Sequence, residues 1–315
     1  MKFNIKNTFK LVVRSFQAFF ESNPFRHSAA IAYYTIFSLP GIAIIAVIIA
    51  GSFYERETVR NELLNQVTLL MGSNSANQIE MLMNKALFSE ESIVMKIVGI
   101  VTLLISTTTV FASLQQSVND IWHIKPKPDK EVFKFIWNRF LSLAMVASIG
   151  FLLLVSLMAD TLMAILKDVV LSSFTDSSYY LIWALNISIS LVLVTFIFAL
   201  IYKVLPDAQV KWKHVWTGAM VTTGLFIAGK FLIGYYLSSS SLGDAYGAAG
   251  SLVALLTWVY YSVLIVLYGA QFTFTYNQMK GRNILPNKEA VAVKVQELEE
   301  GHTSLTKIDE DEKEI

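Results

Sequence analysis

The last long apolar stretch of the chain, residues 249–276, reads AGSLVALLTWVYYSVLIVLYGAQFTFTY and contains no Asp, Glu, Lys or Arg. A helix needs about 20 apolar residues to cross the hydrocarbon layer of a membrane, so this stretch is long enough to span one. Five earlier apolar stretches are also long enough: residues 30–52, 93–121, 140–165, 179–202 and 215–237. The sequence therefore predicts an all-α, polytopic membrane bundle of six transmembrane helices.

The lysines and arginines gather on alternate sides of these six stretches. Four of the 25 occupy the opposite loops, and two, Lys96 and Lys230, lie inside apolar stretches. The other 19 lie in residues 1–28, 123–139, 203–214 and 280–315. Short loops rich in Lys and Arg stay on the cytoplasmic side of a membrane. Both termini are therefore expected in the cytoplasm, which requires an even number of spans.

Composition excludes several classes of protein. With 54% hydrophobic and 16% charged residues, the chain is too apolar for an ordinary soluble domain of 315 residues. It has no cysteine, which excludes a disulfide framework, a thiol nucleophile and a thiolate metal site. The first apolar stretch is longer than that of a signal peptide and five more follow it, so a secretory signal is not expected. One membrane domain, residues 29–280, forms most of the chain.

Three segments outside the spans have patterns of their own. Residues 1–28 are expected to form a cationic interfacial helix, with phenylalanines on one face and lysines on the other. This helix serves either as an orienting anchor or as an element regulated by lipid. Residues 53–92 predict two short amphipathic helices that form a cap on the outer face of the bundle. Residues 281–315 are expected to be a disordered polar tail in the cytoplasm, because they contain too few apolar residues to build a core.

Two predicted spans contain residues that interrupt an apolar helix. In the first, Pro40 and Gly41 are expected to kink or break the helix, because proline removes a hydrogen bond and glycine adds backbone freedom. The segment is either a hinge that lines a transport path or a kink in a purely structural bundle. In the second, Ser113, Gln116 and Asp120 recur at helical spacing and predict a polar face that points into the bundle. That face either holds helices together or lines a vestibule open to the cytoplasm, unless Asp120 simply ends the helix at the interface.

Lys230 lies deep in the fifth predicted span. It follows Trp216 by 14 residues, which is about 21 Å along a helix. A lysine near the centre of a span costs roughly 2.5 to 3.5 kcal/mol, so it needs a carboxylate, a wet cavity or a reachable interface. Asp160, near the outer end of the third span, is the expected ion-pair partner, and Asp244 in the last outer loop is the second candidate. The alternative is that the Lys230 side chain extends its ammonium group to the outer surface.

Several motifs occur together in one family of membrane proteins. They are Ala29-Ala30-Ile31-Ala32-Tyr33-Tyr34 continuing to Pro40, Asn119-Asp120-Ile121-Trp122, Tyr202-Lys203-Val204-Leu205-Pro206-Asp207, Gly218-Ala219, Tyr246-Gly247-Ala248, Trp258-Val259-Tyr260 and Gly269-Ala270-Gln271. With these motifs, residues 10–280 resemble the YihY/BrkB family of bacterial inner-membrane proteins, some of which carry the old label ribonuclease BN. The resemblance implies a six-span protein of poorly defined activity, with proposals that include envelope integrity, serum resistance and export. Such families often have glutamate where this chain has Gln271, so a proton or ion role of that acid would be lost here.

The sequence does not contain the groups of residues that a ribonuclease would need. Metal-assisted cleavage of a phosphodiester needs clustered histidines and carboxylates together with a basic surface. The histidines are scattered, although His27, His123 and His214 all fall at cytoplasmic span ends, and a metal site shared by them is the weaker alternative. No Walker loop, nucleophile elbow or dinucleotide fingerprint occurs. We therefore expect no enzymatic activity, no metal or other cofactor, and no nucleic-acid partner.

Two classes of function fit these patterns. One is a transporter or exporter of an amphipathic, lipid-like or small-molecule substrate, supported by the Pro40 kink, the polar face of the second span and Lys230. The other is a non-transporting envelope-integrity or scaffolding protein whose buried polar groups hold helices together. Membrane lipid is the expected partner in either case, and the sequence does not define an oligomeric state. A wet cavity that touches Lys230 and the Pro40 kink would favour transport, whereas a dry, closed bundle would favour scaffolding.

Overall fold

The computed structural model describes all or nearly all of five predicted spans. Of the third predicted span it describes only residues 140, 144–145 and 148. The described residues are 5–53, 55–71, 73–88, 93–127, 140, 144–145, 148, 177–239 and 250–293. The protein is mostly helical (82%), as predicted. Within the described residues, three helices are long and apolar enough to cross a membrane, and a bent fourth qualifies if its two halves count as one span. The total of six spans and the cytoplasmic position of both termini stay predictions.

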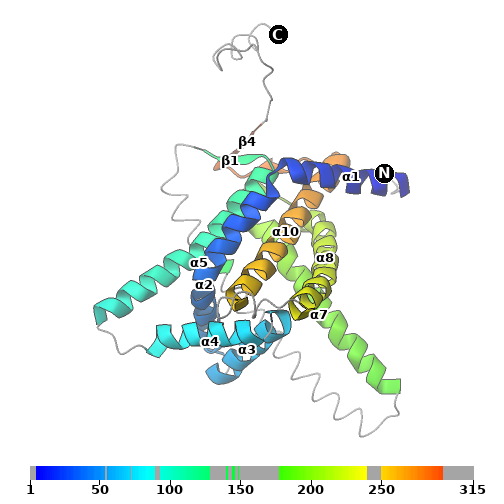
Figure 1. Cartoon of the computed structure of the whole chain (residues 1–315). Helices are drawn as coiled ribbons and strands as arrows, with labels where there is room; N and C mark the ends of the chain where they lie inside the picture. Colours follow the sequence, from blue (N-terminus) through cyan, green and yellow to red (C-terminus); the bar gives the residue numbers. More distant parts are fainter. Residues whose placement is uncertain are drawn as a thin grey trace.

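Eight helices and four short strands make up the described part of the chain (Figure 1). The helices are α1 (Ile5–Glu21), α2 (Pro24–Ala50), α3 (Arg56–Met71), α4 (Ser73–Phe88), α5 (Ile93–Ile121), α7 (Ser177–Val204), α8 (Trp212–Ser239) and α10 (Gly250–Met279). The strands are β1 (Ile124–Pro126), β2 (Ala208–Gln209), β3 (Leu285–Pro286) and β4 (Ala290–Ala292).

The bundle has two distinct ends. Figure 1 shows α1, β1 and β4 at one end, which we call the strand end, and α3 and α4 across the other, which we call the cap end. The segment between the first two predicted spans thus folds as two helices, α3 and α4. Arg60 of α3 joins them, because its guanidinium donates to Glu80 Oε1 at 2.8 Å and to Asn84 Oδ1 at 2.9 Å on α4.

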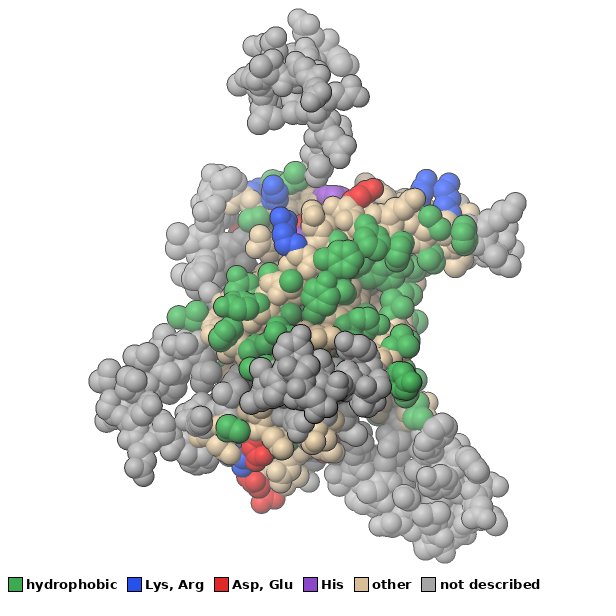
Figure 2. Space-filling view, in the orientation of Figure 1, with side chains coloured by type: hydrophobic (Ala, Val, Ile, Leu, Met, Phe, Trp, Pro, Cys, Tyr) green, Lys and Arg blue, Asp and Glu red, His purple; other side chains and the backbone are tan. Residues whose placement is uncertain are grey.

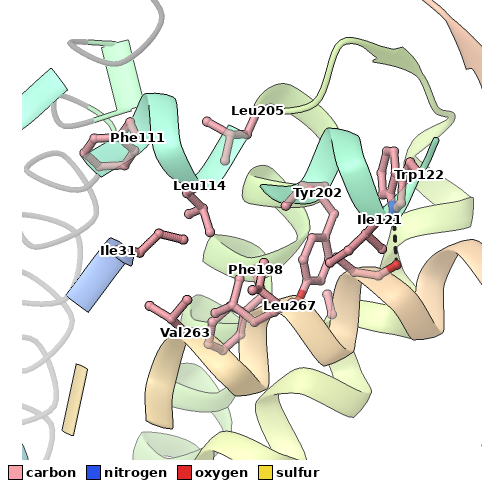
Figure 3. Close-up of a cluster of buried hydrophobic side chains, with 14 of the residues drawn as sticks. Ile31, Phe111, Leu114, Ile121, Trp122, Phe198, Tyr202, Leu205, Val263 and Leu267 are labelled. Atoms are coloured by element: carbon pink, nitrogen blue, oxygen red, sulfur yellow. Dashed lines mark hydrogen bonds between the residues drawn. The ribbon is translucent and has the colours of Figure 1, made fainter. Parts of the chain in front are cut away.

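A large hydrophobic core runs from the strand end into the bundle and joins α2, α5, α7, α8 and α10 (Figure 3). Tyr202 of α7 is completely buried in it. The hydroxyl of Tyr202 donates to the carbonyl oxygen of Val266 on α10 and shares a hydrogen bond with Thr222 on α8, both at 2.8 Å. Because a buried hydroxyl without partners would be costly, these bonds fix α7 against both neighbours.

The surface of the bundle is apolar in the middle and charged near its ends. Figure 2 shows hydrophobic side chains across the middle of this face, with Lys and Arg at the strand end and further charged groups at the cap end. On α1, Phe19 is buried with its ring 5.4 Å from that of Tyr268 on α10, whereas Phe9 is 72% exposed. An apolar belt bounded by charge is typical of a protein that sits in a bilayer.

Part of the segment expected to be disordered is ordered. Residues 281–293 turn back after α10 and carry β3 and β4, which pair antiparallel with β2 and β1 respectively. Gly281 makes the turn, since its φ of +67° lies in the left-handed region that favours glycine after a helix. The prediction of a disordered tail from residue 281 is therefore wrong as far as residue 293, and the all-α class gains four short strands. Such strands are too short to leave a periodic pattern, and their order comes from partners distant in sequence. Residues 294–315 lie outside the described residues.

Candidate functional site

Lys230 lies on α8, with its side chain half-buried. Among the described residues it forms no hydrogen bond or ion pair. Asp160 and Asp244, its predicted partners, both lie outside the described residues. The Lys230–Asp160 ion pair, and the alternative in which the ammonium group reaches the outer surface, therefore stay predictions.

The polar face predicted on the second span is only partly buried, and the alternative in which it lines a vestibule open to the cytoplasm stays a prediction. Gln116 is exposed, and Ser113 and Asp120 are partly exposed, so Gln116 does not point into the described bundle. The buried polar residues of α5 are Thr108, Gln115, Ser117 and Asn119. Neighbouring residues on a helix are about 100° apart, so a stripe one position away faces a different partner. Both stripes have helical spacing in the sequence, and only the packing of α5 distinguishes them.

Asp207, in the turn after α7, is the centre of the polar site at the strand end. Asn119 donates from Nδ2 to one carboxylate oxygen of Asp207 at 2.7 Å, and Gln115 donates from Nε2 to the other at 3.2 Å. The Asp207 backbone N–H in turn donates to Asn119 Oδ1 at 2.9 Å. The end of α5 and the turn after α7 are thus joined by three hydrogen bonds, two of them to a charged group and therefore strong.

The same turn also holds the segment after α10. The backbone N–H of Asn287 donates to the carbonyl oxygen of Asp207 at 2.9 Å, beside the pairing of β2 with β3. A further hydrogen bond joins the end of α5 to α10, because the indole N–H of Trp122 donates to the carbonyl oxygen of Ala270 at 3.0 Å (Figure 3). The sequence motifs contained Asn119, Trp122 and Asp207, but nothing in their spacing predicted that they meet in one site.

A cavity of about 870 Å³ lies next to this site. It is open to the surface and is bordered by the end of α7, β2, the start of α8 and the segment around β3. It is lined by Lys203, Val204, Pro206, Ala208, Gln209, Val210, Lys211, Trp212, His214, Arg282, Asn283, Leu285 and Asn287. Lys203, Lys211 and Arg282 bring three positive charges to the lining, which includes no acidic residue. A cavity of this size and charge suits an anionic group of small-molecule dimensions.

The histidines at the strand end lie in separate surroundings. His27 of α2 shares a hydrogen bond with Ser117 through Nδ1 at 3.1 Å, and its Nε2 lies 3.9 Å from a carboxylate oxygen of Asp120. The ring of His123 packs edge to face on Phe274, and that of His214 lines the cavity. In the described part of the chain, no three His, Asp or Glu side chains are close enough together to hold a metal ion.

Helix α2 bends at the predicted hinge position. Its two halves, Pro24–Leu39 and Gly41–Ile48, meet at 54°. Buried residues before the bend, such as Ile31, belong to the large core of the strand end. Buried residues after it, such as Ala46, belong to a second core formed with α3, α4 and Leu255 of α10. Proline in a helix interior removes a hydrogen bond and displaces the preceding turn, which accounts for a bend at this place.

Together, the apolar helices, the belt between charged ends and the buried polar contacts between spans define an integral membrane protein of the helical class. Residues 15–293 match the family described as virulence factor BrkB, and the chain belongs to this family. The match ends 13 residues after the resemblance expected for residues 10–280 and includes the residues of β3 and β4.

The chain is similar to several bacterial proteins named UPF0761 membrane protein. One from Glaesserella parasuis serovar 5 (strain SH0165) is 27% identical over 197 residues, which are 62% of this chain and 66% of the relative. One from Stenotrophomonas maltophilia (strain K279a) is 25% identical over 258 residues, which are 81% of this chain and 58% of the relative. The chain thus spans less than two thirds of the length of these relatives. No solved structure matches it.

Proposed function

We propose that the protein is a transporter or exporter of amphipathic, lipid-like molecules in the bacterial inner membrane. In this proposal it spans the membrane several times, the strand end faces the cytoplasm, and the chain catalyses no reaction. Membrane lipid is its partner and the source of its substrate. The proposal rests on one observation, the bend of α2 between two hydrophobic cores.

The bend is significant because the buried residues on its two sides belong to different cores. Partly buried residues cross this division: Ile42 and Ile45 after the bend pack against the first core, and Ile36 and Leu39 before the bend pack against the second. In this proposal, a change of angle at Pro40 moves the cap end relative to the strand end, and the residues of α2 that pack across the bend rearrange with it. Transporters use such interrupted spans as hinges between bodies that move against each other.

A second candidate, a scaffolding protein that does not transport, is favoured by the hydrogen bonds between spans. Besides the contacts of Tyr202, Thr195 of α7 and Thr223 of α8 share a buried hydrogen bond at 3.0 Å. In the described residues, the cavity next to Asp207 is lined by neither Lys230 nor Gly41. Polar pairs of this kind hold helices together in a bilayer without forming a path. Movement of lipid is the property that separates the two candidates.

The test is lipid translocation in proteoliposomes that contain fluorescently labelled phosphatidylglycerol. Translocation is measured as the fraction of label that dithionite, added outside, can bleach. The purified protein is expected to raise this fraction above that of protein-free vesicles. Replacing Pro40 by Ala favours a straight helix by about 3 kcal/mol, which corresponds to a shift of about a hundredfold between bent and straight forms. The Pro40→Ala variant is therefore expected to translocate lipid more slowly.

Pro24→Ala is the matched control, because Pro24 is the first residue of the same helix, where proline is tolerated. This variant is expected to translocate lipid like the unchanged protein. If the unchanged protein leaves the bleachable fraction at the level of empty vesicles, the scaffolding candidate replaces the transporter.

A further inference from the structure

We propose that the cavity at the strand end binds a phosphate-bearing anion, such as the headgroup of an anionic lipid or a free phosphate. The site is independent of the proposed transport, since a scaffolding protein could hold the same ligand.

The first argument is the charge of the cavity. Lys203 is the penultimate residue of α7, Lys211 precedes α8, and Arg282 follows α10, so three separate parts of the chain each bring a cation to one space. None of the three forms an ion pair with a described residue. Cations brought together without acidic partners repel one another, and a bound anion would relieve that repulsion.

The second argument is the orientation of Asp207. Its neighbours Pro206 and Ala208 both line the cavity, whereas Asp207 does not. Its carboxylate is directed away onto Asn119 and Gln115, which donate to both of its oxygens. The acid nearest to the lysines in sequence thus directs its carboxylate to α5 and does not line the cavity.

The third argument is the chemistry of the remaining wall. Val204, Trp212 and Leu285 add apolar surface beside the cations, and Leu285 is 59% exposed. The indole of Trp212 stacks on Phe196 of α7, with ring centroids 6.0 Å apart and planes 3° apart. Tryptophan is enriched at the level of lipid headgroups, and basic pockets there bind anionic headgroups. Arg282 adds the planar donor group that matches phosphate oxygens in pairs.

The test uses the full chain in detergent, with phosphatidylglycerol, phosphatidylcholine and inorganic phosphate as the three probes. Lipid binding is measured by native mass spectrometry and phosphate binding by calorimetry. Each cation near a membrane surface contributes enough to change binding about fivefold. Lys203→Gln and Arg282→Gln are therefore each expected to weaken binding of the preferred anion by about fivefold. Arg282→Lys, which keeps the charge, is expected to retain most of the affinity.

Lys125→Gln is the matched control, because Lys125 is an exposed lysine of the strand end that does not line the cavity. Preference for phosphatidylglycerol over phosphatidylcholine, with weak binding of inorganic phosphate, identifies a lipid headgroup as the ligand. Binding of inorganic phosphate without that preference identifies a free phosphate. The proposal is overturned if no anion binds, or if Lys203→Gln and Arg282→Gln bind as tightly as Lys125→Gln. This experiment does not measure lipid translocation. A negative result would therefore overturn the anion site and leave the transport proposal unaffected.

Discussion

Asp207 is the residue on which the polar packing of the strand end converges. It accepts hydrogen bonds from Asn119 and Gln115 through its side chain and from Asn287 through its backbone carbonyl. A carboxylate so close to the hydrophobic core needs such donors, because an unpaired buried charge is very costly. These contacts make Asp207 a structural centre, and the cations beside it remain available to a ligand.

The first prediction concerns Asn119, which both donates to Asp207 and accepts from it. Asn119→Ala removes the hydrogen bonds of Asn119 with the Asp207 N–H and with one carboxylate oxygen. Leaving a buried polar group unsatisfied costs about 1 to 3 kcal/mol, so the free energy of unfolding is expected to fall by that amount. Thermal unfolding in detergent measures it. Gln116→Ala, on the exposed side of the same helix, should change stability by less than about 0.5 kcal/mol, and an equal loss in both variants would contradict the account.

The second prediction compares two glycines in helix interiors. A side chain at Gly269 of α10 would overlap the hydroxyl groups of Tyr202 and Thr222, whereas one at Gly224 of α8 would meet no atom within 4 Å. Gly269→Ala is therefore expected to destabilise the protein by about 1 to 3 kcal/mol. Gly224→Ala is expected to stabilise it by about 0.5 to 1 kcal/mol, since alanine favours a helix over glycine. Chemical unfolding of both variants checks the sign of each change.

The sequence predicted features that depend on a single residue, such as the bend at Pro40. It did not predict which residues pack against each other. The bend lies at the position given by Pro40 and Gly41, because proline acts on its own helix. On α5, the predicted residues Ser113 and Gln116 are three apart and the buried residues Gln115 and Asn119 are four apart, and both spacings are helical, so the sequence does not distinguish the two stripes. Packing against α2 and α10 and the hydrogen bonds to the turn after α7, all distant in sequence, decide which stripe is buried. Lys230 stays a prediction, since its two candidate partners lie outside the described residues.

Among the elements, α1 has apolar side chains on two faces. Phe19 packs on Tyr268 of α10, while Phe9 and Phe16 are exposed. In a protein with an apolar belt, exposed phenylalanines next to Lys10 indicate a helix that lies in the membrane interface. In the structure α1 ends at Glu21, and residues 24–28 of the predicted segment 1–28 belong to α2. The position of α1 in the membrane interface stays a prediction.

The third prediction is that the two faces of α1 differ in lipid exposure. The chain has no cysteine, so a single spin label can be attached at Phe9→Cys or at Lys10→Cys. In lipid nanodiscs, the label at position 9 is expected to be more accessible to oxygen, and that at position 10 to a water-soluble nickel complex. Electron paramagnetic resonance measures both. Equal access of the nickel complex to the two positions would place α1 away from the bilayer.

The four short strands could not be predicted from the sequence, whereas the helices could. Predicting the helices needs only length and apolar content, which residues 249–276 illustrate and α10 bears out. Strands of two or three residues have no such signal, and β3 and β4 are ordered by β2 and β1. The polar composition from residue 281 correctly indicates that this segment adds few side chains to the hydrophobic core. It does not indicate whether the backbone of the segment pairs with other strands.

For the whole molecule, the fourth prediction concerns orientation. The distribution of Lys and Arg predicts the strand end in the cytoplasm and the cap end outside. Asn65→Cys on α3 and Gln278→Cys on α10 are exposed positions at opposite ends. In intact spheroplasts, a membrane-impermeant maleimide is expected to label position 65 and to reach position 278 only after lysis. Labelling in the reverse pattern would invert the topology, and labelling of both before lysis would contradict the even number of spans.

The two hydrophobic cores give the molecule two bodies that meet at the bend of α2. One contains α5, α7, α8 and most of α10, and the other contains α3 and α4. Leu255 of α10 belongs to the second core, so contact between the bodies is maintained on that side. The transport proposal requires these bodies to adopt more than one relative position.

The fifth prediction is the most direct test of that requirement. Spin labels at Asn65→Cys and Gln278→Cys in one chain report the distance between cap end and strand end in lipid nanodiscs, by pulsed electron double resonance. The account predicts two distance populations for the chain with Pro40, reduced to one by Pro40→Ala and retained with Pro24→Ala. A single narrow distance that is the same with Pro40 and with Ala at that position would contradict the hinge.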